Sequence, residues 1–201
     1  MKKCILSFFV LLLLSVVELK AQVFERLQSL GGAQNDAIKQ AVADAAGNLY
    51  VAGTFMGVCA FDIAGDSTRT ASSIDAFVAK YSADGSLLWV KQFGGSGIDQ
   101  ALRIAIGANN HIYVGGSFDA TVDFDPDAVG VANLSTAGNF DVFLLQLDGN
   151  GDFVSVQQWG TSRYESLYSI GVDGSNNVYV AAFTFNDSID VDPNAGVNNM
   201  H

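Results

Sequence analysis

Short apolar runs alternate with clusters of turn residues along most of this chain. In the middle third, the pattern predicts a short extended segment at 121–125 and four β-strands, at about 101–106, 111–118, 141–147 and 153–159. Gly, Asn and Asp punctuate these runs at 94–97, 107–110 and 148–151. Strands of this length separated by such turns are typical of antiparallel β-sheet.

One strand is repeated three times. NLYVAGTF at 48–55 recurs as HIYVGGSF at 111–118 and as NVYVAAFTF at 177–185. When the tyrosines of these strands are aligned, DAFVAKYSADGSLLWVKQF at 75–93 also matches DVFLLQLDGNGDFVSVQQW at 141–159. The matching segments cover nearly all of residues 22–201, so the sequence predicts a tandem array of similar units. The aligned tyrosines are Tyr50, Tyr113 and Tyr179.

The repeat indicates whether one ambiguous segment forms a helix or a strand. Residues 37–46, AIKQAVADAA, are Ala-rich and could form an amphipathic helix. The matching segments, ALRIAIGANN and SLYSIGVDGS, carry Ile, Tyr and Gly where a helix would be weak. Because equivalent positions of a repeat share one conformation, we predict a strand over 37–46.

The predicted strands are apolar or small on both faces. In 111–118, Ile112, Val114 and Phe118 point one way, whereas Tyr113, Gly115 and Ser117 point the other way. A single sheet cannot cover both of its own faces, so the units must stack face to face. Four-stranded sheets stacked around an axis form a β-propeller. We therefore expect an all-β chain of stacked four-stranded antiparallel blades.

The N-terminal residues have the pattern of a secretory signal peptide, which we assign to residues 1–21. Lys2 and Lys3 precede an apolar run at 5–17, and Ala21 is suited to cleavage before Gln22. The run is shorter than the roughly 20 residues that span a bilayer. A lipoprotein is disfavoured because Cys4 precedes the apolar run. We expect a secreted or cell-surface protein that is not inserted in the membrane after cleavage.

Charge narrows the classes of partner. Residues 1–21 hold three of the 10 basic and one of the 21 acidic residues, which leaves 7 basic, 20 acidic and a formal net charge of −13 in residues 22–201. Such a chain repels phosphate backbones and anionic lipid headgroups. We therefore expect no nucleic-acid partner and no peripheral attachment to a membrane.

Several motifs of the repeat together resemble those of a known family. DAAGNLYVAGTF, TVDFDP and DAFVAKYSADGSLLWVKQFGG together resemble the bacterial β-propeller repeat (SBBP) family, common in secreted Bacteroidetes proteins, over about residues 24–193. The resemblance implies an extracytoplasmic propeller, often part of a longer chain with a C-terminal sorting domain for type IX secretion. It implies no particular enzymatic activity.

The units do not complete a ring. We place them at about 31–93 and 94–159, with a partial unit at 160–201 that lacks its last two strands. VFERLQSLGG at 23–32 matches LLWVKQFGG at 87–95, so residues 23–30 are predicted to form the outer strand of a neighbouring blade. Since a propeller closes with about four blades or more, we expect an N-terminal fragment of a longer chain, whose further blades are its partners, rather than an assembly of several chains.

Nucleophilic catalysis has little support. His111 stands at a turn position held by Asn48 and Asn177 in the other units, and His201 is the last residue, so neither is a good candidate for a catalytic base. Cys59 is the one cysteine of residues 22–201, which excludes an intramolecular disulfide there. We interpret it as a small buried hydrophobe.

Acidic segments raise the question of a metal. DGNGD at 148–152 resembles half of a calcium loop, and DFDPD at 123–127 groups three carboxylates. However, Phe153 replaces the expected glycine, and no bidentate Glu follows. The matching turn SADGS at 82–86 has a single acid. We favour hairpin turns and assign no metal, cofactor or catalytic residue.

Three further motifs have weaker functional interpretations. VDFDP at 122–126 recurs as IDVDP at 189–193 but is CAFDI at 59–63, which favours a strand end blunted by proline over a glycosidase pair. GGSG at 94–97 has no following Lys-Ser or Lys-Thr and is interpreted as a turn between sheets. The glycosylation triplets at Asn133 and Asn186 are uninformative in a bacterial protein.

Aromatic residues are candidates for carbohydrate recognition. Trp89, Trp159, Tyr113 and Tyr179 could present rings to a glycan, but recurrence at matched positions favours packing between blades. We therefore expect an exported, non-enzymatic propeller module that binds protein or glycan. The alternatives are a propeller hydrolase or lyase acting on polysaccharide and a purely structural spacer.

Overall fold

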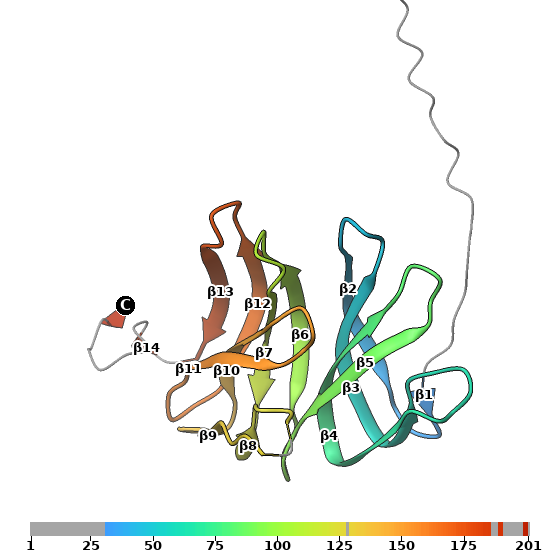
Figure 1. The fold of residues 1–201 in the computed structure, drawn as a ribbon. Helices are drawn as coiled ribbons and strands as arrows, with labels where there is room; N and C mark the ends of the chain where they lie inside the picture. The colour runs from blue at the N-terminus through green and yellow to red at the C-terminus, as the bar shows by residue number, and fades with distance from the viewer. Residues whose placement is uncertain (1–30, 128, 186–188, 191–198, 201) are drawn as a thin grey trace, which may run out of the picture.

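The structure, a computed structural model, describes residues 31–127, 129–185, 189–190 and 199–200. Every regular element in these residues is a β-strand, as expected for an all-β chain (Figure 1). No helix that could cross a membrane occurs within them. The predicted signal peptide at 1–21 and the predicted outer strand at 23–30 lie outside the described residues.

Three antiparallel sheets follow one another along the chain, and we call them units one, two and three. Unit one has the strand order β2–β3–β4–β5, and β1 pairs with the far end of β3. Unit two has the order β6–β7–β10–β11, and unit three contains β12 and β13. The two smaller pairs are β8 with β9 and β14 with β15.

The strands of unit one are β1 (Gly31–Gly32), β2 (Ala37–Ala43), β3 (Leu49–Ala60), β4 (Thr68–Tyr81) and β5 (Leu87–Phe93). Unit two and its small pair contain β6 (Gln100–Ile106), β7 (Ile112–Phe118), β8 (Thr121–Asp123), β9 (Asn133–Ser135), β10 (Asp141–Leu147) and β11 (Phe153–Trp159). The remaining strands are β12 (Glu165–Val172), β13 (Val178–Thr184), β14 (Ile189–Asp190) and β15 (Asn199–Met200). The predicted strands of the middle third are confirmed, and β2 confirms a strand in the Ala-rich segment.

The first hairpin of each unit repeats in backbone detail. A β-bulge interrupts the ladder between Ile38 and Gln40 in unit one, between Ala101 and Arg103 in unit two, and between Leu167 and Ser169 in unit three. The turns of these hairpins place Gly47, Asn110 and Asn176 at φ of 85°, 62° and 64°. Gly and Asn are the residues that adopt this left-handed conformation most readily. The bulges and turns therefore have the same conformation in all three units.

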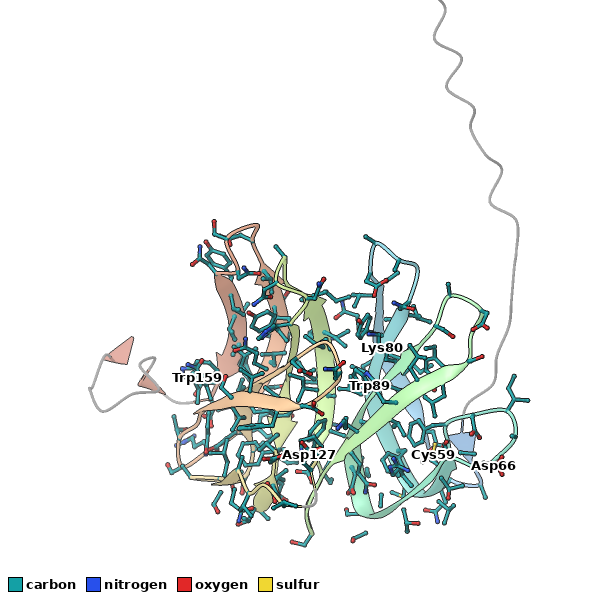
Figure 2. All side chains as sticks on the ribbon, in the orientation of Figure 1. Cys59, Asp66, Lys80, Trp89, Asp127 and Trp159 are labelled. Carbon is teal, nitrogen blue, oxygen red and sulfur yellow. The ribbon has the colours of Figure 1, made fainter. Side chains whose placement is uncertain are left out.

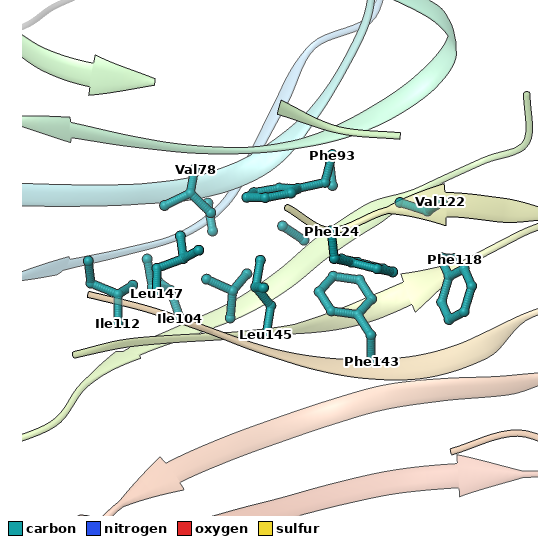
Figure 3. Close-up of a cluster of buried hydrophobic side chains, with 14 of the residues drawn as sticks. Val78, Phe93, Ile104, Ile112, Phe118, Val122, Phe124, Phe143, Leu145 and Leu147 are labelled. Carbon is teal, nitrogen blue, oxygen red and sulfur yellow. The ribbon is translucent and has the colours of Figure 1, made fainter. Parts of the chain in front are cut away.

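The largest hydrophobic cluster lies between units one and two. Val78 and Phe93 of unit one pack against Ile104, Leu145 and Leu147 of unit two (Figure 3). Tyr50, one of the repeated tyrosines, is also buried in this cluster. The prediction that the units bury apolar sheet faces against each other is confirmed at this junction.

An aromatic triad also repeats. Phe61 packs on Phe55 and Phe77, with ring centroids 5.5 and 4.9 Å apart. In unit two, Phe124 packs in the same way on Phe118 and Phe143, with centroids 5.3 and 4.7 Å apart. Phe61 and Phe124 come from the connections that follow β3 and β7, the segments noted in the sequence as CAFDI and VDFDP. These connections therefore cover the sheets with an aromatic ring.

The third repeated tyrosine differs from the other two. Tyr50 and Tyr113 are buried, with 3% and 5% of their surfaces exposed, whereas Tyr179 is 62% exposed. Both Tyr50 and Tyr113 face the unit that follows in the chain. No further sheet covers Tyr179 among the described residues, so the three aligned tyrosines do not have like surroundings.

Candidate functional site

A groove of about 350 Å³ opens between units two and three. Tyr113, Ser155 and Trp159 line the wall that belongs to unit two, and Val178 and Val180 line the opposite wall on β13. Trp159 is the last residue of β11 (Figure 2). The two junctions differ here, because Trp89 and Lys80 pack against Tyr50 in the matching space between units one and two.

The side chains that fill the first junction come from matched positions of the repeat. Trp89, which aligns with Ser155, meets Tyr50 edge to face with ring centroids 6.2 Å apart. Lys80 Nζ lies 4.9 Å from the centroid of the Tyr50 ring and donates to the carbonyl oxygen of Gly149 at 3.1 Å. Lys91 Nζ lies 3.2 Å from a carboxylate oxygen of Asp127. These side chains connect unit one to unit two.

Neutral residues replace these groups in the second junction. Gln146 aligns with Lys80, and Gln157 with Lys91. Gln146 Nε2 lies 2.7 Å from His111 Nδ1 and 3.4 Å from the Tyr113 hydroxyl, and the Ser155 hydroxyl donates to Gln146 Oε1 at 3.2 Å. The polar groups of the groove wall on unit two are therefore amides and hydroxyls, and His111 contacts this network through Gln146.

The aromatic candidates fall into two groups. Tyr113 and Trp159 line the groove, whereas Trp89 fills the first junction. The two tryptophans are not equivalent, because Trp159 aligns with Phe93 and Trp89 aligns with Ser155. The interpretation that they recur at matched positions is therefore wrong, although Trp89 does pack between units as expected.

The acidic turns form hairpins. Asp148 Oδ1 accepts hydrogen bonds from the backbone N–H groups of Asn150 and Asp152, at 2.8 and 3.0 Å. Asp123 Oδ1 accepts from the N–H groups of Asp125 and Ala132, at 3.1 and 2.8 Å. These carboxylates are used to hold the local backbone, as the preferred interpretation of DGNGD and DFDPD expects.

Two sets of buried carboxylates were not singled out in the sequence. Asp99 accepts from the N–H groups of Gly95 at 2.8 Å and Asp119 at 3.2 Å, and Glu165 accepts from the N–H of Thr161 at 2.8 Å. Asp75 lies within β4 and Asp141 is the first residue of β10, and their carboxylates accept hydrogen bonds from the side chains of Gln92 and Gln158. Their recurrence at aligned positions is the signal that could have found them.

The backbone N–H groups of two of these residues connect consecutive units. The N–H of Asp99 donates to the Ile74 carbonyl at 2.8 Å, and the N–H of Glu165 donates to the Phe140 carbonyl at 2.9 Å. Each bond belongs to a parallel bridge between the start of one unit and the third strand of the preceding unit. Gly95 lies in this connection and is so close to β8 that a Cβ would be 2.2 Å from the Thr121 oxygen. GGSG is therefore part of the connection between units, as predicted.

Burial perturbs the acids at these connections. Burial raises the pKa of Asp99 to about 6, although the backbone N–H groups of Gly95 and Asp119 favour the charged form. Burial also raises the pKa values of Asp75 and Asp141, against the effect of the hydrogen bonds that they accept. A perturbed carboxyl can mark a catalytic site, but buried structural networks produce the same shift.

The remaining sequence candidates have local partners or lie outside the described residues. Burial raises the pKa of the Cys59 thiol to about 11, with a further contribution from Asp36, so the thiol stays protonated at neutral pH. Cys59 is buried in a second hydrophobic cluster on unit one, as expected for a small hydrophobe. Asn133 begins β9, whereas Asn186 and His201 lie outside the described residues.

Sequence comparison finds similarity to parts of two much larger proteins. Over 113 residues, 54% of this chain, it is 33% identical to the regulatory protein FlaEY of Caulobacter vibrioides. Over 149 residues, 60% of the chain, it is 26% identical to an uncharacterized WD repeat-containing protein, L264, of Acanthamoeba polyphaga mimivirus. Each match spans 11% of the relative's own length. No family model matches the chain.

Proposed function

We propose that this protein is an exported, non-enzymatic scaffold whose units are blades of a β-propeller and whose surface binds a protein or glycan ligand. The observation that carries the proposal is the repeated junction, in which units stack through apolar faces while carboxylates hold the turns and connections. WD repeats form four-stranded propeller blades, so the similarity to the WD repeat-containing protein supports the same arrangement. The resemblance to secreted bacterial propeller repeats supports it too.

Export follows from the leader pattern and has a direct test. The full chain is expressed in a Gram-negative host, and its N-terminus is determined in the cytoplasmic and exported fractions. We expect exported protein that begins at Gln22. A variant with Leu11 and Leu12 replaced by arginine disrupts the apolar run and should remain uncleaved in the cytoplasm. Cytoplasmic, uncleaved wild-type protein would contradict export.

The binding role is separated from polysaccharide cleavage by a second experiment. Residues 22–201 are run through gels that each contain one polysaccharide. The protein is also incubated with each polysaccharide in solution, and the solution is assayed for new reducing ends and unsaturated sugars. If the protein is a scaffold, its migration is retarded in one or more gels, or it captures a protein partner, and no product is released. Product release that is abolished in Asp99→Asn or Asp141→Asn would instead assign a carboxylate-dependent hydrolase or lyase.

A further inference from the structure

A pocket of about 520 Å³ lies beside β11, the fourth strand of unit two, and we call it the β11 pocket. Its lining includes Leu134 of β9, Asp141 of β10, and Val156 and Gln158 of β11. Leu134 and Val156 also pack against the hydrophobic cluster that units one and two share. The pocket therefore lies on the side of unit two that faces unit one, at the outer edge of a sheet whose four strands are all described.

Unit one has an arginine at the position of Leu134. Arg69 and Leu134 are equivalent, because each pairs with the residue two places before the ring that completes the aromatic triad of its unit. The matched glutamines of β5 and β11, Gln92 and Gln158, support this equivalence. Each donates to the carbonyl oxygen of the residue that follows Arg69 or Leu134, at 2.9 and 2.8 Å. The repeat therefore exchanges a cation in unit one for an apolar side chain in unit two.

Arg69 covers the edge of β5. Its Nη2 donates to the carbonyl oxygen of Val90 at 3.2 Å, and its Nη1 donates to that of Thr68 at 2.9 Å. Val156 has the same register position on β11 as Val90 has on β5, but Val90 is buried and Val156 only partly so. In the part of the chain that the structure describes, no side chain donates to the Val156 carbonyl. Unit two thus keeps the acceptor of unit one without its cation.

The lining of the β11 pocket supplies further acceptors. Gln158 Nε2 donates to a carboxylate oxygen of Asp141 at 2.5 Å, which leaves the amide oxygen of Gln158 as an acceptor. Oδ1 of Asp141 is buried and has no hydrogen-bond partner within the described residues. No lysine or arginine is among the described residues that line the pocket. A guanidinium group carries only N–H donors and a positive charge, so it is complementary to this lining.

We propose that the β11 pocket binds an arginine side chain of a protein partner, whose guanidinium group takes the place that Arg69 holds in unit one. The guanidinium donates to the Val156 carbonyl and to the amide oxygen of Gln158, and Asp141 contributes negative charge. Arginine is preferred to lysine because its planar group can donate to two acceptors in a fixed geometry. The proposal gives the chemistry of a partner for the protein-binding role proposed above and rests on that role.

The binding test uses isotope-labelled residues 22–201 and short blocked peptides. The probe is acetyl-Gly-Thr-Arg-Thr-Gly-amide, which contains the residues around Arg69. Its control carries citrulline, a neutral residue of nearly the same shape, in place of arginine. Binding is followed by NMR, and we expect saturable shifts in the amides of 155–158 and in the side-chain amide of Gln158. The citrulline peptide should bind at least about tenfold more weakly.

Reciprocal substitutions locate the site. Leu134→Arg gives unit two the arginine of unit one, so it should cover the Val156 carbonyl and weaken peptide binding at least about tenfold. Leu134→Met keeps an apolar side chain and should bind as the wild type does. Arg69→Leu uncovers the Val90 carbonyl, so the peptide should then shift the amides of 89–92 as well. This last variant tests the proposal even if Leu134→Arg does not fold.

Three results would overturn the proposal. The first is unchanged signals of 155–158 at peptide concentrations up to about 10 mM, which would reveal even a millimolar dissociation constant. The second is equal binding of the arginine and citrulline peptides. The third is that neutral oligosaccharides, and not the arginine peptide, shift 155–158, which would make the pocket a glycan site. A scaffold that captures its ligand while 155–158 stay unchanged would refute this pocket and leave the proposed function standing.

Discussion

Trp89 and Ser155 occupy the same position of two repeat units, but only Trp89 packs against the repeated tyrosine of its own unit. The Trp89 indole lies against Tyr50 with an angle of 68° between the rings, whereas Ser155 borders the groove above Tyr113. Trp89→Ser should therefore leave a cavity between units one and two. We expect a loss of about 2–3 kcal/mol in the free energy of unfolding, measured by urea denaturation.

The neighbouring Leu88 provides the control for this substitution. It is 52% exposed, so Leu88→Ser should change stability by less than about 0.5 kcal/mol. Equal losses for the two variants would show that Trp89 contributes nothing specific to the junction.

Phe93 and Phe124 connect two units through stacked rings. Their centroids lie 6.4 Å apart with an interplanar angle of 23°. A double-mutant cycle with Phe93→Leu and Phe124→Leu should give a coupling energy of about 0.5–1.5 kcal/mol in urea unfolding. A control cycle combines Phe93→Leu with Phe61→Leu. Phe61 occupies the same triad position as Phe124 but belongs to the other hydrophobic cluster. There the coupling should fall below about 0.5 kcal/mol, and similar values in both cycles would contradict the assignment.

Stability should depend on pH through the buried carboxyls. The pKa of Asp99 is raised to about 6 in the folded protein, so its contribution is complete below the unfolded value near 3.8 and is lost as pH rises through about 6. Asp75 and Asp141 act in the same direction because burial raises their pKa values as well. We expect a higher free energy of unfolding at about pH 4.5 than at pH 7.5.

Asp99→Asn identifies the group responsible, because it removes this titration while keeping the size of the side chain. The dependence on pH between 4.5 and 7.5 should become flatter, even if the variant is less stable throughout. A slope identical to that of the wild type would assign the dependence to other groups.

The hairpin carboxylates act in the opposite direction. The Asn48 side chain, together with backbone N–H groups, lowers the pKa of Asp44, so its contribution is present above about 3.8 and is lost as pH falls further. Asp44 Oδ1 accepts from the N–H groups of Ala46 and Asn48, both at 2.9 Å. Asp44→Ala should cost about 1 kcal/mol at pH 6 by urea unfolding. Asp66→Ala, at an exposed loop position, is the control and should have little effect.

Periodicity and repetition predict the strands well because both follow from local chemistry. Residues 37–46 would be ambiguous alone, and the matching segments correctly identify a strand. The two tryptophans show where the interpretation fails, since it treats them as recurring at matched positions although the alignment and the strand register both place Ser155 at the position of Trp89. The filling of a junction depends on side-chain volume and on the strands that cover it, which no single strand encodes.

The β3–β4 hairpin shows a second limit. In the aligned segments CAFDI and VDFDP, Cys59 and Ala60 belong to a continuous β3, whereas Thr121–Asp123 forms the separate strand β8. Gly57, at φ 62°, lies at a register shift that carries β3 onward to Ala60. A local bulge thus decides whether similar sequences continue a sheet or leave it.

The shared bulges of the first hairpins have a consequence for engineering. Because Lys39, Leu102 and Tyr168 are the residues skipped by the same irregularity, the hairpins that contain them have interchangeable backbones. Whole hairpins could then be transplanted from one position of the array to another without new loops. Chimeric arrays of chosen length would be the natural product of that modularity.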